Sequence, residues 1–191
     1  MSRERRSRST VVPWIGLALG VVGFTMSLGV AFCLAVPTSG LAQASGLVWV
    51  YDARAERLLV DPRPSAAVQA EARRLTLMSL DQAPANATAW LRLAYLDSLQ
   101  PTGLGQAGRD ALARSYVVAP YGPDDTAWRL RFALEHWTAL DPDLRGRAMA
   151  ELQLAARPNG YRSLPAQIDD PAGRLAATLT LMPVVDEAGG R

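Results

Sequence analysis

The residues best suited to catalysis are few in this chain of 191 residues. Its only histidine, His136, follows Glu135, and its only cysteine is Cys33. Catalysis by histidine needs a positioned partner together with a nucleophile or a metal, and the neighbouring sequence supplies none. A single cysteine cannot form an intrachain disulfide, and a single histidine nearly excludes a zinc site of the usual Cys/His type. The sequence therefore predicts no enzyme activity, no metal and no cofactor.

Two pairs of neighbouring carboxylates also bear on metal binding, namely Asp124 with Asp125 and Asp169 with Asp170. Each pair precedes a predicted helix, where acidic side chains accept hydrogen bonds from free backbone N–H groups and complement the helix dipole. We interpret both pairs as helix caps. This interpretation leaves binding, rather than catalysis, as the expected class of activity.

The charge of the chain is concentrated at its N-terminus. All 20 basic residues are arginines and 18 residues are acidic, which gives a net charge of +2. Residues 1–10 hold four of the arginines and only one acid, so residues 45–191 have 16 arginines against 17 acids, a net charge of −1. Nucleic-acid binding depends on clustered cations, and the nearly neutral composition of residues 45–191 does not indicate a nucleic-acid-binding surface. The use of arginine alone, with abundant alanine, indicates a bacterial chain.

A membrane-spanning helix is predicted over residues 11–36, which carry no charge. A helix of this length measures about 39 Å, more than the roughly 30 Å of the hydrocarbon core. The arginines of residues 1–10 favour a cytoplasmic N-terminus, which places the following residues across the bilayer. We therefore expect a single-pass protein of the bacterial inner membrane with a periplasmic body.

A cleaved signal peptide is the alternative interpretation of the same segment. Ala42, Gln43 and Ala44 form a small-x-small site before Ser45, where a signal peptidase could cut. Cleavable signals usually have an apolar region of about 7–15 residues, and this one is longer, which favours the uncleaved anchor. Both interpretations export the body, and both stay open at this point.

Small residues recur near every fourth position of the predicted span. A stripe of this kind lets two helices approach closely in a bilayer, and it predicts a helix partner or a homo-oligomer. The same spacing also arises by chance in a chain rich in alanine and glycine, so the two interpretations remain balanced. The residues are Gly16, Gly20, Gly23, Ser27 and Ala31.

The body beyond this segment is predicted to be all-α. Ser65, Asp141 and Asp170 stand where N-caps are expected, and prolines follow the two aspartates at the first helical position. Apolar residues then recur at helical spacing, without a convincing alternating strand. Helices are expected at residues 66–80, 88–99, 111–118, 126–140, 144–156 and 172–181, with a stem at 45–64 and a turn at 103–108.

Two segments of the body repeat in the same order. Residues 79–84, SLDQAP, return as residues 115–120, SYVVAP, at an offset of 36. Residues 88–94, TAWLRLA, return as residues 126–133, TAWRLRFA, at an offset of 38. A fixed period of this length is typical of stacked helical hairpins.

The better-defined unit, residues 88–120, resembles the tetratricopeptide repeat, which pairs two helices in about 34 residues. The positions that carry the resemblance are Trp90, Leu93, Ala94, Leu112, Ser115 and Pro120. The unit departs from the pattern at Asp97, where an aromatic residue is expected. It also departs at Gly108, which replaces the alanine expected as the first small residue of the second helix. In the next unit Arg131 stands where leucine is expected, so the resemblance leaves its register open.

The resemblance implies a small repeat domain at residues 65–158, followed by a capping helix and tail at 159–191. Repeats of this kind bind peptides in a groove lined by their first helices, which implies Tyr95, Arg129, His136 and Trp137 as partner contacts. We expect Trp90, Trp128 and Phe132 to pack in the core. A solvated helix face is the alternative explanation of His136.

The sequence thus predicts a membrane-anchored periplasmic scaffold that binds other envelope or membrane proteins. Envelope polysaccharide synthesis or export is one such setting, by analogy alone. The alternative is a small accessory subunit that docks into a larger membrane complex through its membrane helix. A periplasmic enzyme is the least favoured class.

Overall fold

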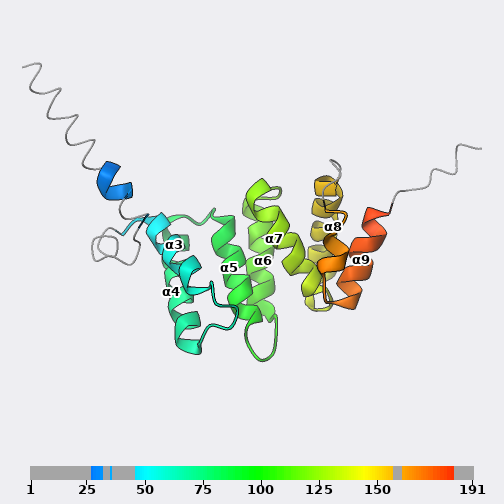
Figure 1. Ribbon diagram of the computed structural model, residues 1–191, viewed down its shortest axis with the longest axis horizontal. Coiled ribbons are helices and arrows are strands. Elements are labelled where there is room, and N and C mark those ends of the chain that lie inside the picture. The colour runs from blue at the N-terminus through cyan, green and yellow to red at the C-terminus, as the bar shows by residue number, and fades with distance from the viewer. Residues whose placement is uncertain (1–26, 32–34, 36–45, 157–160, 183–191) are drawn as a thin grey trace, which may run out of the picture.

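The computed structural model describes residues 27–31, 35, 46–156 and 161–182. This part of the chain contains helices and no strand, which confirms the predicted all-α class. The helices stand side by side in an elongated row, with α3 and α4 at one end and α9 at the other (Figure 1). The elements are α3 (Val48–Leu58), α4 (Ala66–Gln82), α5 (Ala87–Ser98), α6 (Gln106–Val118), α7 (Pro123–Glu135), α8 (Pro142–Ala156) and α9 (Pro171–Leu181), with the short 3₁₀ helices η1 (Trp137–Ala139) and η2 (Leu164–Gln167).

Polar side chains fix the start of four of these helices. Each accepts a hydrogen bond from a backbone N–H of the first turn, which would otherwise lack a partner. The capping residues are Ser65, Asn86, Asp141 and Asp170, at nitrogen–oxygen distances of 3.4, 3.1, 2.9 and 2.7 Å respectively. The predicted caps at Ser65, Asp141 and Asp170 are confirmed, whereas Asn86 was not recognised as the cap of α5.

Helix α7 begins and ends earlier than the predicted range of 126–140. Gly122 is its N-cap residue and Pro123 occupies the first turn, so Asp125 lies inside the helix and is not its cap. The α-helix ends at Glu135, and the chain continues as η1. Asp169 is no cap either, because Asp170 is the N-cap residue of α9. The backbone N–H groups of Asp169 and Asp170 donate to the carboxylate of Glu135.

The expected stem at residues 45–64 is instead the first helix of the array. Helix α3 buries Val50, Tyr51 and Ala55, and the last two pack with Leu75 of α4. These apolar positions follow helical spacing, but the segment has no capping side chain at its start. Without a cap, the apolar spacing alone does not distinguish this helix from a stem. Trp49 of the same helix is 51% exposed.

Successive helices pack as antiparallel hairpins that stack on one another. Helices α3 and α4 contact each other, as do α5 and α6, and α7 and α8. Helix α5 also contacts α4 and α7, and α9 contacts α7 and α8. The helices α3, α5 and α7 are therefore the first helices of three hairpins, and α9 covers the end of the row (Figure 1).

The departures of the first unit from the repeat pattern have a local cause. Gly108 belongs to α6 and not to a turn, and a Cβ at this residue would lie 2.6 Å from Oδ2 of Asp97 on α5. The same carboxylate accepts a hydrogen bond of 2.7 Å from the backbone N–H of Gly105, where α6 begins. Asp97 therefore caps α6 from the neighbouring helix, and only glycine leaves room for it.

The position of the last helix, α9, also depends on a glycine that lets two backbones approach closely. A Cβ added to Gly173 would lie 1.9 Å from the backbone oxygen of Leu134 on α7. This contact seats α9 directly on α7 and completes a small core around Leu134, Leu152 and Ile168. A second and larger core fills the space between α5, α6, α7 and α8, and Trp137 packs against both.

Most of the predicted membrane segment, residues 11–36, lies outside the described residues. So do Gly16, Gly20 and Gly23, the arginine-rich residues 1–10 and the bond between residues 44 and 45. Ser27 and Ala31 lie in a short helical segment, 27–31, and both side chains are exposed. Among the described helices, none has the length and apolar character that a bilayer crossing requires.

Candidate functional site

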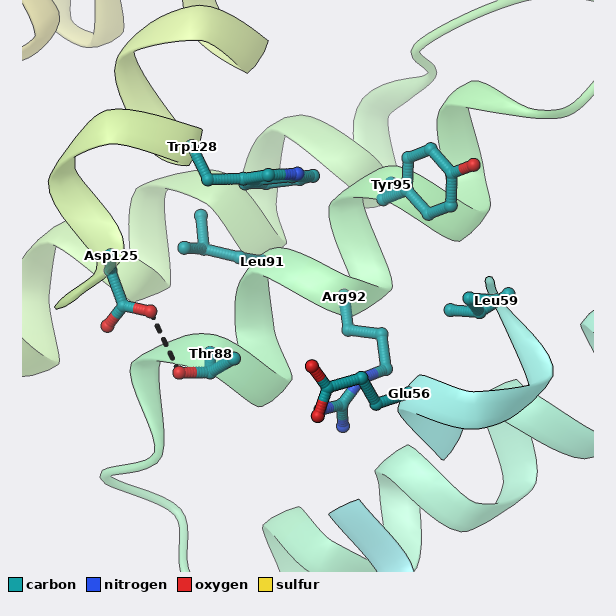
Figure 2. A pocket seen from close by; sticks show the side chains of 8 residues that line it. All are labelled: Glu56, Leu59, Thr88, Leu91, Arg92, Tyr95, Asp125 and Trp128. Atoms are coloured by element: carbon teal, nitrogen blue, oxygen red, sulfur yellow. Dashed lines mark hydrogen bonds between the residues drawn. The ribbon is translucent and has the colours of Figure 1, made fainter. Parts of the chain in front are cut away.

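A pocket of about 390 Å³ opens where the three first helices α3, α5 and α7 face a common space. We call it the first-helix pocket. Figure 2 shows its lining side chains converging from the three helices and from the residue that follows α3. They are Glu56, Leu59, Thr88, Leu91, Arg92, Tyr95, Asp125 and Trp128.

Helix α5 forms the floor of the pocket. Thr88, Leu91, Arg92 and Tyr95 stand at intervals of three, one and three residues, which places them on one face of a helix. The cap at Asn86 fixes the start of this helix and hence the position of the four side chains along its axis. The floor therefore presents the half-buried ring of Tyr95 beside polar atoms, whereas Leu91 is only 3% exposed.

The charge of Arg92 is used within the fold. Its Nη1 donates to Oδ1 of Asp52 on α3 at 3.0 Å, and the side chain is 8% exposed. The other oxygen of Asp52 accepts a hydrogen bond of 2.8 Å from Nδ2 of Asn86. The Arg92–Asp52 ion pair thus joins α3 to α5 and leaves little positive charge for a ligand.

Two further carboxylates stand at the pocket. Asp125 accepts a hydrogen bond of 2.8 Å at Oδ1 from the hydroxyl of Thr88, across the gap between α7 and α5 (Figure 2). Glu56 projects from α3 on the other side, and its side chain is exposed. Within the described residues, neither carboxylate is ion-paired. The accessible charge of the pocket is therefore negative.

Aromatic rings form the wall of the pocket on the α7 side. The Trp128 ring meets Tyr95 edge to face at 6.2 Å between centroids and stacks on Phe132 at 5.0 Å. Phe132 in turn lies 4.6 Å from the ring of His136. Burial lowers the pKa of His136, against smaller opposing effects of the Glu135 and Asp170 carboxylates, and so favours the neutral ring.

The exposed position of Trp128 corrects the predicted core. The internal repeat aligns Trp128 with Trp90. Trp128 is nevertheless 42% exposed and lines the pocket. Trp90 packs against the larger core, and its Nε1 donates a hydrogen bond to the backbone oxygen of Pro84. Phe132, as expected, is buried.

Across the pocket, residues of the two first helices face each other at a constant offset. Thr88 and Leu91 of α5 line it as Asp125 and Trp128 of α7 do, and both pairs are separated by 37 residues rather than 38. One residue corresponds to about 100° around a helix. Trp128 and Trp90 therefore do not face the same surroundings, although the sequence repeat aligns them.

The four predicted partner contacts do not gather in one place. Tyr95 lines the first-helix pocket, but His136 and Trp137 lie at the far end of α7, half-buried against neighbouring side chains. Arg145 lies over the ring of Trp137, with its guanidinium carbon 5.6 Å from the centroid. The fourth residue, Arg129, has no exposed surface at all.

Arg129 joins three helices in the interior. Its guanidinium pairs with Glu151 of α8, with Nε 3.1 and 3.2 Å from the two carboxylate oxygens, and lies 4.2 Å from the ring centroid of Tyr116. It also donates to the backbone oxygens of Ser115, Ala119 and Pro120 at the end of α6. Arg129 is buried and its N–H groups donate to acceptors within the fold, so it does not belong to the surface that a partner could contact.

Sequence reasoning missed seven of the pocket residues. A signal was present in α5, where Thr88, Leu91 and Arg92 share the face of the predicted contact Tyr95. No comparable signal pointed to Glu56 and Leu59, because their segment was taken for a stem. Asp125 was interpreted as a cap, and Trp128 as core.

The pocket is suited to binding. Thr88 and Tyr95 supply the hydroxyl groups of its lining, and the Thr88 hydroxyl donates to Oδ1 of Asp125. In the described residues no three His, Cys, Asp or Glu side chains are grouped to hold a metal. An open tryptophan beside leucine, tyrosine and two carboxylates instead matches the composition of recognition sites.

Comparison with known proteins adds no relative to this description. Neither a family model, nor a curated protein, nor a solved structure matches the chain significantly.

Proposed function

We propose that this protein is a non-catalytic scaffold of the bacterial inner membrane that binds a segment of a partner protein in its first-helix pocket. The observation that carries the proposal is the pocket itself, which is lined from three consecutive hairpins and holds an exposed tryptophan. Large exposed aromatic side chains in a concavity are typical of residues that supply binding energy. The stacked hairpins support a likeness to tetratricopeptide repeats, whose first helices line the binding surface.

The proposed location rests on the sequence. Residues 11–36 are uncharged and follow four arginines, which favours a cytoplasmic N-terminus and a periplasmic body. Protease treatment of spheroplasts is expected to digest the body while leaving residues 1–10 protected. N-terminal sequencing of the mature protein distinguishes the uncleaved anchor from a signal cut between residues 44 and 45.

The binding function is tested by photo-cross-linking in cells. A benzophenone side chain is placed at Tyr95, inside the pocket, or at Val117 on α6, which is 55% exposed and does not line it. We expect position 95 to give an adduct with a defined protein, identified by mass spectrometry, and Trp128→Ala to abolish it. Equal adducts at both positions, or an adduct indifferent to Trp128→Ala, would refute the proposal.

A second candidate function follows from the small residues of the membrane segment, which favour docking as an accessory subunit. In this case Gly20→Leu together with Ser27→Leu would abolish co-purification of partners. Trp128→Ala would leave co-purification intact. The reverse result supports the scaffold.

A further inference from the structure

We infer that the first-helix pocket selects a partner segment that carries an arginine or lysine next to a large apolar side chain. This inference rests on the proposed binding function and specifies the chemistry of the ligand. It arises from the combination of two unpaired carboxylates with an open aromatic wall in the same pocket.

The carboxylates of the pocket decide the sign of the ligand's charge. Asp52 neutralises Arg92, whereas Glu56 and Asp125 have no cationic partner within the described residues. Thr88 engages only Oδ1 of Asp125, which leaves the other oxygen able to accept a hydrogen bond. A cationic side chain of the ligand can therefore pair with a carboxylate that the fold itself leaves without a cation.

The same geometry disfavours an anionic ligand. Arg92 is the only base among the lining residues, and it is 8% exposed and bonded to Asp52. A phosphate or acidic peptide would meet two like charges without gaining a free cation. Like charges repel one another, and the repulsion is stronger where water is excluded.

The position of Asp125 explains why the cation and the apolar side chain should be close together. Asp125 and Trp128 lie one helical turn apart on α7, and Figure 2 shows the carboxylate beside Thr88 with the indole above it. A guanidinium or ammonium at Asp125 can also contact the indole face, which attracts cations. The neighbouring half-buried ring of Tyr95 is then left for an aliphatic or aromatic side chain of the ligand.

The experiment uses the full chain in detergent micelles and a random ten-residue peptide library displayed on phage. We expect the selected peptides to carry arginine or lysine within a few residues of a large apolar residue. Synthetic copies should lose at least about tenfold in affinity when the basic residue becomes glutamine, which corresponds to one charge-assisted contact of about 1.4 kcal/mol.

The variant Glu56→Gln with Asp125→Asn should abolish this preference, since both changes keep the shape of the side chain but remove its charge. The matched control, Asp81→Asn with Asp143→Asn, removes two exposed charges that do not line the pocket and should leave it intact. Circular dichroism verifies that each variant is folded.

The outcomes separate the inference from the function beneath it. The inference is overturned if the selected peptides need Trp128 but show no preference for basic residues. It is also overturned if that preference survives in the Glu56→Gln, Asp125→Asn variant. In both cases the proposed binding function still stands. If no selected peptide depends on Trp128, both fail. Basic peptides that lose affinity only in the pocket variant support both.

Discussion

Replacing Arg129 by methionine is expected to lower the free energy of unfolding by about 3–5 kcal/mol, the usual effect of breaking a buried ion pair. Arg129 has no exposed surface, and the side chain of its partner Glu151 is 2% exposed. The change would leave a buried carboxylate without its cation, although one of its oxygens would still accept a hydrogen bond of 2.8 Å from the hydroxyl of Thr126. A loss of this size shifts the unfolding equilibrium by more than about 100-fold.

The assay is urea unfolding of the detergent-solubilised chain, followed by circular dichroism. Arg131→Met is the matched control, because Arg131 is two residues away on the same helix and exposed, so its loss should stay within about 0.5 kcal/mol. Adding Glu151→Leu to Arg129→Met should recover part of the stability, since it removes the buried charge that the single change strands.

The reasoning would be refuted if Arg129→Met cost no more than Arg131→Met. It would also fail if the double variant were less stable than Arg129→Met alone. Either result would mean that Arg129 does not hold α6, α7 and α8 together, and its place among the partner contacts would need to be reconsidered.

Three further predictions concern stability. Gly173→Ala should cost about 1–3 kcal/mol by thermal unfolding because its Cβ would overlap the Leu134 oxygen. Gly146→Ala in α8, where nothing lies within 4 Å, should instead gain up to about 1 kcal/mol, and equal effects would contradict the contact. Asp97→Ala should cost about 0.5–2 kcal/mol by urea unfolding, because the Gly105 N–H loses its acceptor; no measurable loss would count against the cap. Because burial lowers the pKa of His136, the unfolded state binds a proton first as the pH falls through 6.5, so stability decreases there. His136→Gln should reduce the loss measured between about pH 7.5 and 5.5; an unchanged loss would assign it to other groups.

Local sequence signals determined the all-α class and many of the helix boundaries. Ser65, Asp141 and Asp170 were recognised as caps because a capping bond joins residues only three positions apart. Helix α5 was predicted within one residue at each end for the same reason, since its apolar period and its flanking breakers are local. Tyr95 could be named as a contact because the resemblance to tetratricopeptide repeats assigns the binding surface to side chains of the first helices.

What the sequence could not supply were features that depend on distant residues. Helix α3 was taken for a stem because its stability comes from packing on α4 rather than from a cap. Arg129 was placed on a surface because its partner Glu151 lies 22 residues away on α8. Trp128 was assigned to the core because the exact rotation of α7 follows from how the hairpins stack, and one residue of register turns a side chain by about 100°. The first-helix pocket exists only once three hairpins are in place, and so only the tertiary structure decided it.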